Sequence, residues 1–288
     1  MIYQSPEDYL NAPRKAVALF GMSGLGKTRT AAMLREGGAW FHYSVDYRIG
    51  TRYMGEHIVD NFKREAMRNP FLRQLLRTDS IYIASNISFE NLSPLSTYLG
   101  KPGDPSMGGI PFEDYVTRQR QHREAEIAAL EDTPLFIEKA HDIYGYAHFV
   151  CDTGGSICEV VDPDDPRDPV LTTLAEHLLM VQIRGTAAQA DELVRRFEKH
   201  PKPMYYPEDL LRRLWAEYRE AHGVCETQVD PDGFIAWGFR RLLEHRLPLY
   251  DAIARNWGVT VEAAEIEALR APGDFDALIA GAIRRTPA

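Results

Sequence analysis

Short apolar runs alternate with amphipathic stretches along the chain, and this alternation predicts strands and helices in turn. Compact apolar runs predict strands over residues 16–20, 40–46, 80–84, 147–152 and 178–183. Apolar positions three or four residues apart predict helices over residues 28–36, 55–77, 113–144, 187–199, 207–221, 232–245, 249–257 and 275–285. Strands that alternate with helices are typical of a parallel sheet covered on both faces. The pattern therefore predicts an α/β fold that binds ligands at the carboxyl ends of its strands.

One long segment fits neither pattern. Residues 91–111 contain four prolines and four glycines, which is too irregular for a helix or strand and too long for a simple connection. We interpret this segment as part of an insertion that covers a substrate. The expected organisation is one domain over residues 1–288, with a helical and irregular insertion over residues 55–145 and a lid with an extra helical segment over residues 185–222.

Composition and charge exclude several classes of protein. The 288 residues are 44% hydrophobic and 26% charged, as in folded globular proteins. A formal net charge of -9 disfavours nucleic acid as a partner, because phosphate backbones attract basic surfaces. No apolar run approaches the roughly 20 residues that cross a bilayer, and the first residues lack signal-peptide features, so we expect a cytoplasmic protein without a membrane partner. The three cysteines lack metal-ligand or disulfide spacing and are expected to be free thiols: Cys151, Cys158 and Cys225.

A glycine-rich motif follows the first predicted strand and precedes a predicted helix. Residues 21–28 read Gly-Met-Ser-Gly-Leu-Gly-Lys-Thr, which matches the P-loop pattern G-x-x-x-x-G-K-[ST] at every fixed position. Backbone N–H groups of such a loop surround phosphate oxygens, Lys27 reaches the β- and γ-phosphates, and Thr28 binds Mg²⁺. The sequence thus predicts a site for ATP and Mg²⁺, with these nucleotide-binding residues: Gly21, Ser23, Gly24, Leu25, Gly26, Lys27, Thr28 and Arg29.

Two acidic residues stand at the ends of other predicted strands. Asp46 ends the strand that follows the P-loop helix, where a carboxylate can orient an acceptor hydroxyl for phosphoryl transfer. Asp152 ends the strand over residues 147–152, where an acid can hold Mg²⁺ directly or through water. Turn formation alone also explains an aspartate at either position.

These motifs together resemble the shikimate kinase family of P-loop small-molecule kinases. The matching features are the P-loop, Asp46 with Ile49 three residues later, Gly154-Gly155 after a strand, and Arg-Leu-Pro-Leu-Tyr over residues 246–250. The resemblance implies a parallel sheet of nucleoside-monophosphate-kinase type, flanked by helices. It also implies that Asp46 contacts the acceptor hydroxyl, that Gly154 and Gly155 line the acceptor pocket, and that Arg246 binds an acidic group of the acceptor.

The same resemblance suggests residues for the lid and for the rest of the acceptor site. Arg195 and Arg196 fall where the arginine-bearing lid is expected, although both also fit a solvated helix face. Arg48 and Arg64 follow Asp46 and are candidates for binding an anionic acceptor.

The chain departs from the family in one metal-binding position and in length. Ser44 replaces the first acid of the D-x-D motif, so we assign its metal role to Asp152. The long insertions argue against shikimate as the substrate. We therefore expect an ATP-dependent kinase of a small, anionic hydroxyl compound, and the alternative is a P-loop ATPase or nucleotide-dependent switch that acts on a protein partner.

Overall fold

The computed structural model describes residues 1–286, which divide into two compact units. We call them the sheet unit and the helical unit. The sheet unit comprises Met1–Val45, Glu126–His200 and the chain from Trp237 onward, and the helical unit comprises Asp46–Ala125 and Pro201–Ala236. Each unit is described by itself.

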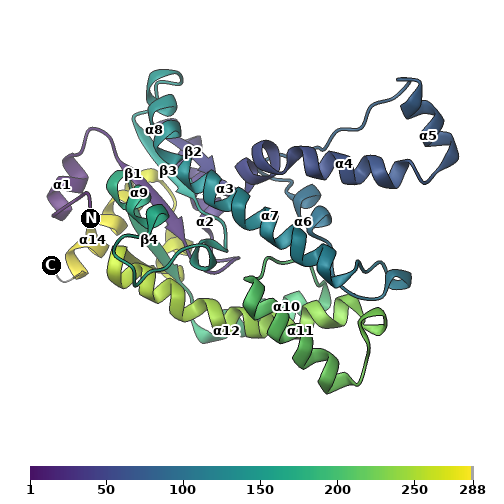
Figure 1. Ribbon diagram of the computed structural model, residues 1–288. Helices are drawn as coiled ribbons and strands as arrows, with labels where there is room; N and C mark the ends of the chain where they lie inside the picture. The colour runs from purple at the N-terminus through teal and green to yellow at the C-terminus, as the bar shows by residue number, and fades with distance from the viewer. Residues whose placement is uncertain (287–288) are drawn as a thin grey trace. The chain divides into compact units, whose positions relative to one another are not determined.

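The sheet unit is built on five parallel strands in the order β2-β3-β1-β4-β5 (Figure 1). The strands are β1 (Ala16–Phe20), β2 (Trp40–Ser44), β3 (His148–Asp152), β4 (Leu179–Arg184) and β5 (Gly258–Glu262). β1 lies at the centre, and Val17, Leu19 and Phe20 are completely buried, as expected for a strand covered on both faces. The chain leaves β1 towards β2 on one side, whereas β4 and β5 lie on the other. The loop after β1 is therefore at the point where the strand order reverses, which is where ligands bind in open α/β sheets.

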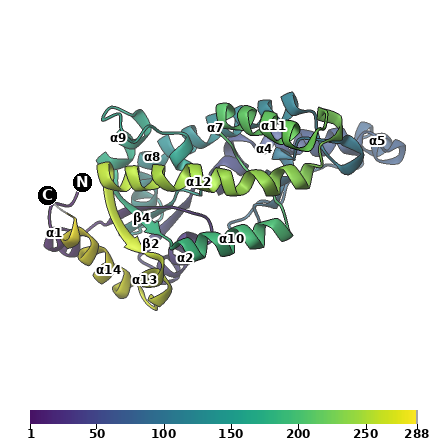
Figure 2. The same ribbon diagram turned by 90° about the horizontal axis from the view of Figure 1, so that it is seen from below.

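Helices cover both faces of this sheet. Figure 2 shows α8 (Thr133–Asp142), α9 (Pro169–His177) and α12 (Pro231–Trp257) on one side, and α2 (Lys27–Glu36), α13 (Ala263–Ala268) and α14 (Pro272–Arg285) on the other. The unit also contains α1 (Pro6–Asn11), α10 (Ala187–Lys199) and a short 3₁₀ turn at Ile157–Glu159. This arrangement confirms the expected α/β fold with an all-parallel sheet.

The helical unit joins two segments that are far apart in the sequence. Its elements are a π-helical turn (Ile49–Tyr53), α4 (Gly55–Ala66), α5 (Pro70–Arg77), α6 (Ser93–Leu99), α11 (Glu208–His222) and two 3₁₀ turns (Pro105–Met107 and Glu226–Gln228). Three helices run across the division between the units, namely α3 (Val45–Arg48), α7 (Phe112–Glu131) and α12.

Ion pairs and stacked rings hold the two segments of the helical unit together. Arg212 of α11 forms two hydrogen bonds with Glu113 of α7, at 2.8 and 3.0 Å. Phe112 and Trp215 stack with their ring centroids 4.6 Å apart. Parts of the two stretches that we expected to be separate insertions, residues 55–125 and 201–222, therefore pack on each other in one unit.

The structure differs from the expected organisation in several ways. The chain forms two compact units rather than one domain, and residues 126–145 and the helix over residues 187–199 belong to the sheet unit. The helices expected over residues 232–245 and 249–257 are one helix, α12, which continues through Pro248. Residues 80–84 are not part of any sheet, and β2 ends at Ser44, so that Asp46 lies in α3. None of the helices within residues 1–286 has the length and apolar character needed to span a membrane.

Candidate functional site

The loop between β1 and α2, residues 21–26, has a backbone conformation that requires glycine. Gly21, Gly24 and Gly26 have φ angles of 129°, 82° and 94°, which side chains with a Cβ rarely adopt. A Cβ on Gly21 would also lie 2.5 Å from the carbonyl oxygen of Ile183. We call this segment the glycine-rich loop. Its shape explains why glycines occur at these spacings and not elsewhere in the loop.

Lys27 begins α2 and folds back over the glycine-rich loop. Its Nζ donates hydrogen bonds to the carbonyl oxygens of Gly21 at 2.7 Å and Met22 at 3.1 Å. The residue is only 6% exposed. A positive charge is thus held at the concave side of a loop whose N–H groups and helix N-terminus already favour anions.

Thr28, the next residue, is joined to the end of β3. Its Oγ1 donates a hydrogen bond of 2.5 Å to Oδ2 of Asp152, while Oδ1 of Asp152 accepts one of 3.2 Å from the backbone N–H of Gly154. The contact follows from the sheet order, because β3 pairs with β1 and Asp152 lies beside Leu19. Thr28 and Asp152, which are each predicted to hold Mg²⁺, are thus in contact.

The chemistry of this pair fits a magnesium ion bound together with phosphates. A hydroxyl and a carboxylate are the oxygen ligands that Mg²⁺ prefers, and Mg²⁺ is commonly held by one or two carboxylates plus substrate phosphates. Residues 1–286 contain no cluster of three or more histidine, cysteine, aspartate or glutamate side chains that could bind a metal alone. One hydroxyl and one carboxylate supply only part of the coordination shell of Mg²⁺, so these two residues fit a metal whose other ligands include phosphate oxygens.

The loop after β3 contacts the glycine-rich loop and also Glu126 of α7, a residue that the sequence analysis does not single out. A Cβ on Gly155 would lie 2.7 Å from Oγ of Ser23, so the two loops touch at this point. The next residue, Ser156, donates its hydroxyl proton to the carboxylate of Glu126, whose two oxygens are both 2.8 Å away. Glu126 is fully buried. Its only sequence signal is a carboxylate among apolar neighbours of α7, which we had interpreted as an ordinary helix.

His42 of β2 is a second buried polar group near Asp152. Burial lowers the pKa of His42 to about 4, although the nearby charge of Asp152 acts in the opposite direction, and Arg35 lowers it further. The imidazole is therefore neutral at pH 7.

The arginines expected in a lid lie on α10, in the sheet unit. A Cβ on Gly24 would lie 3.8 Å from a guanidinium nitrogen of Arg196, which places this side chain beside the glycine-rich loop. Arg195 forms an ion pair with Glu192, and the Arg196 Nε is 3.7 Å from the same carboxylate. Both arginines are largely exposed. Arg196 is thus the better placed of the two to reach a bound anion.

Contacts with α12 hold α10 in this position. The rings of Phe197 and Phe239 stack with centroids 3.7 Å apart, and Arg240 donates to Asp191 at 3.0 Å. These contacts lie in the second and the last turn of α10 and attach the helix to α12.

Arg246 is not available for a ligand, in contrast to the role that the family resemblance implies. Its guanidinium donates to both carboxylate oxygens of Glu159, at 2.9 and 3.0 Å, and the two side chains are 6% and 0% exposed. Burial raises the pKa of Glu159, and the positive charge of Arg246 opposes that rise. On the same helix, the hydroxyl of Tyr250 donates to the carbonyl of Gly155. Through Arg246 and Tyr250, the Arg-Leu-Pro-Leu-Tyr segment therefore holds the loop after β3 in place.

The remaining predicted acceptor residues belong to the helical unit. Asp46 lies two residues beyond the end of β2, Arg48 lies over the ring of Tyr53 at 5.5 Å, and Arg64 is exposed on α4. Their roles stay predictions. Among the predicted nucleotide-binding residues, Arg29 lies on α2 and borders a small cavity of about 170 Å³ with Ile266 and Arg270.

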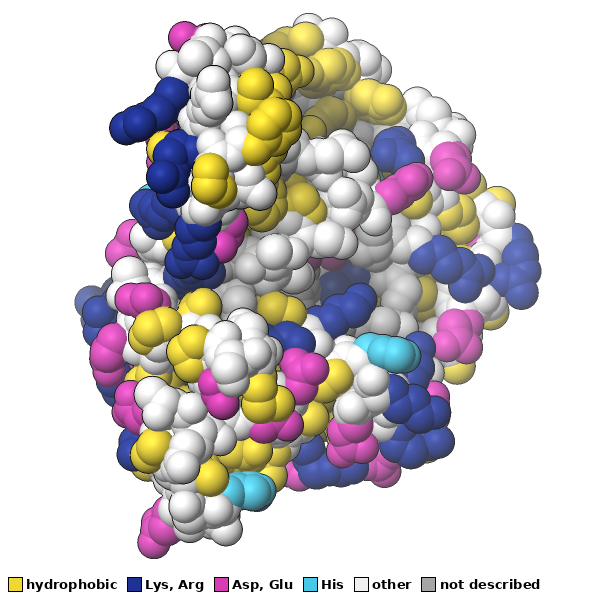
Figure 3. All heavy atoms as spheres, turned by 90° about the vertical axis from the view of Figure 1, so that its right-hand side faces the viewer, with side chains coloured by type: hydrophobic (Ala, Val, Ile, Leu, Met, Phe, Trp, Pro, Cys, Tyr) yellow, Lys and Arg dark blue, Asp and Glu magenta, His cyan; other side chains and the backbone are white. Residues whose placement is uncertain are grey.

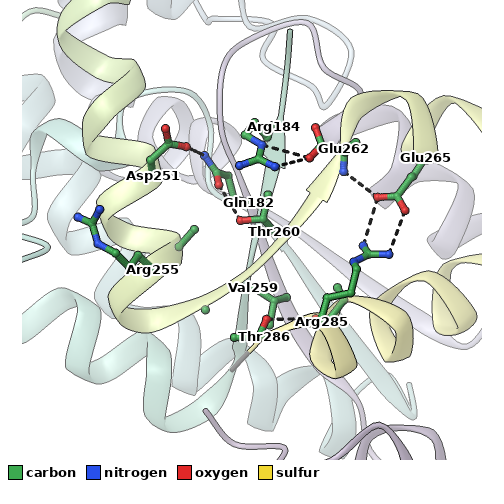
Figure 4. Close-up of a pocket in the computed structure, with 13 residues that line it drawn as sticks. Gln182, Arg184, Asp251, Arg255, Val259, Thr260, Glu262, Glu265, Arg285 and Thr286 are labelled. Carbon is green, nitrogen blue, oxygen red and sulfur yellow. Dashed lines mark hydrogen bonds and ion pairs between the residues drawn. The ribbon is translucent and has the colours of Figure 1, made fainter. Parts of the chain in front are cut away.

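A larger polar cavity of about 860 Å³ lies along β5, at the edge of the sheet (Figure 4). Most of its charged side chains are already paired: Arg184 with Glu262, and Arg285 with Glu265. Gln182 donates to Asp251 at 2.7 Å. Neither the glycine-rich loop nor any predicted acceptor residue lines this cavity.

Comparisons with known proteins add no relative to this picture. No family model, no curated protein and no solved structure matches the chain.

Proposed function

We propose that the protein binds ATP with Mg²⁺ at the glycine-rich loop, as a P-loop NTPase does, and transfers the γ-phosphoryl group. The hydrogen bond between Thr28 and Asp152 carries this proposal. In phosphoryl-transfer sites of this class, a hydroxyl at the start of the helix and a carboxylate on a neighbouring strand hold the metal. A glycine-rich turn that binds no ligand needs neither the hydroxyl nor the carboxylate.

Each residue of the site has a distinct task in this proposal. Lys27 gives up its two carbonyl partners and neutralises the β- and γ-phosphates. Thr28 and Asp152 hold Mg²⁺, which supplies charge neutralisation to the phosphate oxygens. Arg196, beside Gly24, closes over the phosphates and excludes water.

The acceptor that we favour is the hydroxyl group of a small metabolite in the cytoplasm. Asp46 supports this choice because it follows β2 by two residues and β2 ends beside Asp152. A carboxylate that orients an alcohol in line with the γ-phosphate supplies most of the positioning that transfer requires. We propose that Asp46 has this role.

Water is the second candidate acceptor, and one observation favours it. Arg246, the residue that the kinase resemblance assigns to an acidic acceptor, already binds Glu159 through two of its three guanidinium nitrogens. An ATPase needs no such pocket. In that case, the helical unit is the part through which a nucleotide-dependent switch acts on a protein partner.

Label from the γ-phosphate of ATP distinguishes the two candidates. The purified protein is incubated with labelled ATP and Mg²⁺, with and without a pool of small cellular metabolites, beside Lys27→Ala as the control. Label in a new compound identifies a kinase and its acceptor, and label only in inorganic phosphate at an unchanged rate identifies an ATPase. Equal activity of Lys27→Ala and the unchanged protein would show that the glycine-rich loop is not the site.

A further inference from the structure

Residues 81–87, between α5 and α6, form a strand-like segment outside the sheet. The sequence Ile-Tyr-Ile-Ala-Ser-Asn-Ile runs without helical turns, and half-buried and exposed positions alternate at every residue. Alternation with a period of two is the signature of a β-strand with one covered face. Tyr82, on the open face, is 89% exposed.

The backbone of this segment lacks the partner that a strand normally has. In the described chain, no N–H or C=O group of residues 81–87 bonds to another backbone group. Among the described residues, one side chain forms a hydrogen bond with this backbone: Nδ2 of Asn91 donates to the carbonyl oxygen of Asn86 at 2.7 Å. A row of unpaired groups on a strand-like segment is a template for another strand.

Contacts within the helical unit hold the two ends of the segment. Before it, the N–H of Ser80 donates to the carbonyl of Leu75 at 2.9 Å. After it, the ring of Phe89 stacks on Tyr47 with centroids 4.7 Å apart, and a Cβ on Gly50 would lie 3.0 Å from Ile87. The segment is therefore presented in one conformation, which reduces the entropy lost on pairing.

The composition of the segment fits a second copy of itself. Residues 80–89 contain no charge, no proline and no glycine, and they are rich in isoleucine and aromatic residues, so that identical strands meet without like-charge repulsion. In an antiparallel pair centred on Ala84, Ile81 of one copy faces Ile87 of the other. Tyr82 then faces Asn86. This register places apolar side chains opposite each other on the covered face.

A neighbouring apolar surface enlarges the contact. Helix α5 has no buried residue, and its Phe71 is 68% exposed. Figure 3 shows apolar side chains gathered over the upper part of the face on which α4 and α5 lie. Two strands alone are only marginally stable in water, so this added surface is needed for a measurable dimer.

We propose that two copies of the chain associate through residues 81–87, which form a two-stranded antiparallel ribbon about a twofold axis. The contact is isologous, because the same patch serves on both copies. We expect a dissociation constant on the order of 10 μM, since the ribbon is short and only α5 extends it. This proposal does not depend on the nucleotide chemistry.

Two double variants test the register as well as the contact. Tyr82→Lys with Asn86→Lys puts like charges opposite each other at two places, whereas Tyr82→Lys with Asn86→Glu puts opposite charges there. Both positions are exposed, so neither variant should disturb the fold. Sedimentation velocity of the full chain, over about 5 to 200 μM, gives the dimer constant.

The expected result is a monomer–dimer equilibrium in the unchanged protein. The lysine–lysine variant should weaken it about tenfold or more, and the lysine–glutamate variant should stay within about threefold of the unchanged protein. A monomer at every concentration overturns the proposal. So does an equal effect of both variants, because the copies then associate through another surface.

Discussion

The hydroxyl of Thr28 and the carboxylate of Asp152 are 2.5 Å apart, although 124 positions separate them in the sequence. Thr28 lies in the first turn of α2, and Asp152 ends β3, the strand beside β1. The pairing of β1 with β3 thus brings a helix start and a strand end to one point. Our proposal that this pair holds Mg²⁺ for phosphoryl transfer rests on that contact.

Asp152→Asn should weaken the proposed binding of Mg²⁺ at Thr28 and Asp152 without changing the local structure. The amide oxygen still accepts the hydrogen bond of Thr28, but the negative charge that attracts Mg²⁺ is lost. We expect at least a tenfold loss of Mg²⁺-dependent ATP affinity, measured by calorimetry with and without EDTA, and an unchanged melting temperature. Asp142→Asn, at an exposed position of α8, is the matched control. Unchanged affinity in Asp152→Asn would contradict the metal role.

Lys27→Ala should abolish phosphoryl transfer without unfolding the protein. The variant loses the cation at the glycine-rich loop, and we expect kcat/KM to fall by about 100-fold or more. The hydrogen bonds to Gly21 and Met22 are also lost, so thermal unfolding should be measured beside the activity. A variant that is folded and fully active would exclude this loop as the site.

Much of the sheet unit could be predicted because its signals are local. Buried β-branched and aromatic runs specify the strands, and the fixed spacing of Gly21, Gly26 and Lys27 specifies the loop. These features need no knowledge of how distant segments pack. Asp152 is predicted as a metal-binding residue from its place at the end of a strand, but its contact with Thr28 depends on the pairing of β3 with β1.

The missed features depend on long-range packing. Glu126 of α7 and Ser156 of the loop after β3 are 30 positions apart in the sequence, and no local pattern predicts their contact. The sequence around Arg246 resembles a ligand-binding motif, whereas its actual partner, Glu159, is 87 positions away in the sequence and buried with it. Residues 80–84 have the composition of a strand, but within residues 1–286 no strand pairs with them.

Gly155→Ala should disturb the glycine-rich loop through the contact between Gly155 and Ser23. The new methyl group would lie 2.7 Å from Oγ of Ser23, so the serine must rotate or the loops must separate. We expect ATP affinity to fall about three- to tenfold. Adding Ser23→Ala should restore part of it by removing the clashing atom. Gly273→Ala, where a methyl group meets nothing within 4 Å, should leave affinity unchanged.

His42 should make the fold sensitive to mild acid. Its pKa is lowered to about 4 in the folded protein, from 6.5 in the unfolded chain. Between these values the unfolded chain binds more protons, so stability is complete above pH 6.5 and falls as the pH drops towards 4. The loss at pH 5 is about 2 kcal/mol. Urea unfolding of His42→Gln at pH 7 and pH 5 should show a smaller loss than the unchanged protein, and equal losses would contradict the assignment.

Arg246→Met should reveal whether Arg246 is structural or holds an acceptor. The substitution leaves Glu159 charged and buried without its partner, which typically costs about 3–5 kcal/mol of unfolding free energy. Adding Glu159→Met removes the stranded charge and should recover most of that loss, as measured by urea unfolding. A structural pair predicts that the double variant also recovers phosphoryl transfer or hydrolysis. If the double variant is stable but its KM for an acidic acceptor rises tenfold or more, Arg246 binds that acceptor after exchanging Glu159 for it.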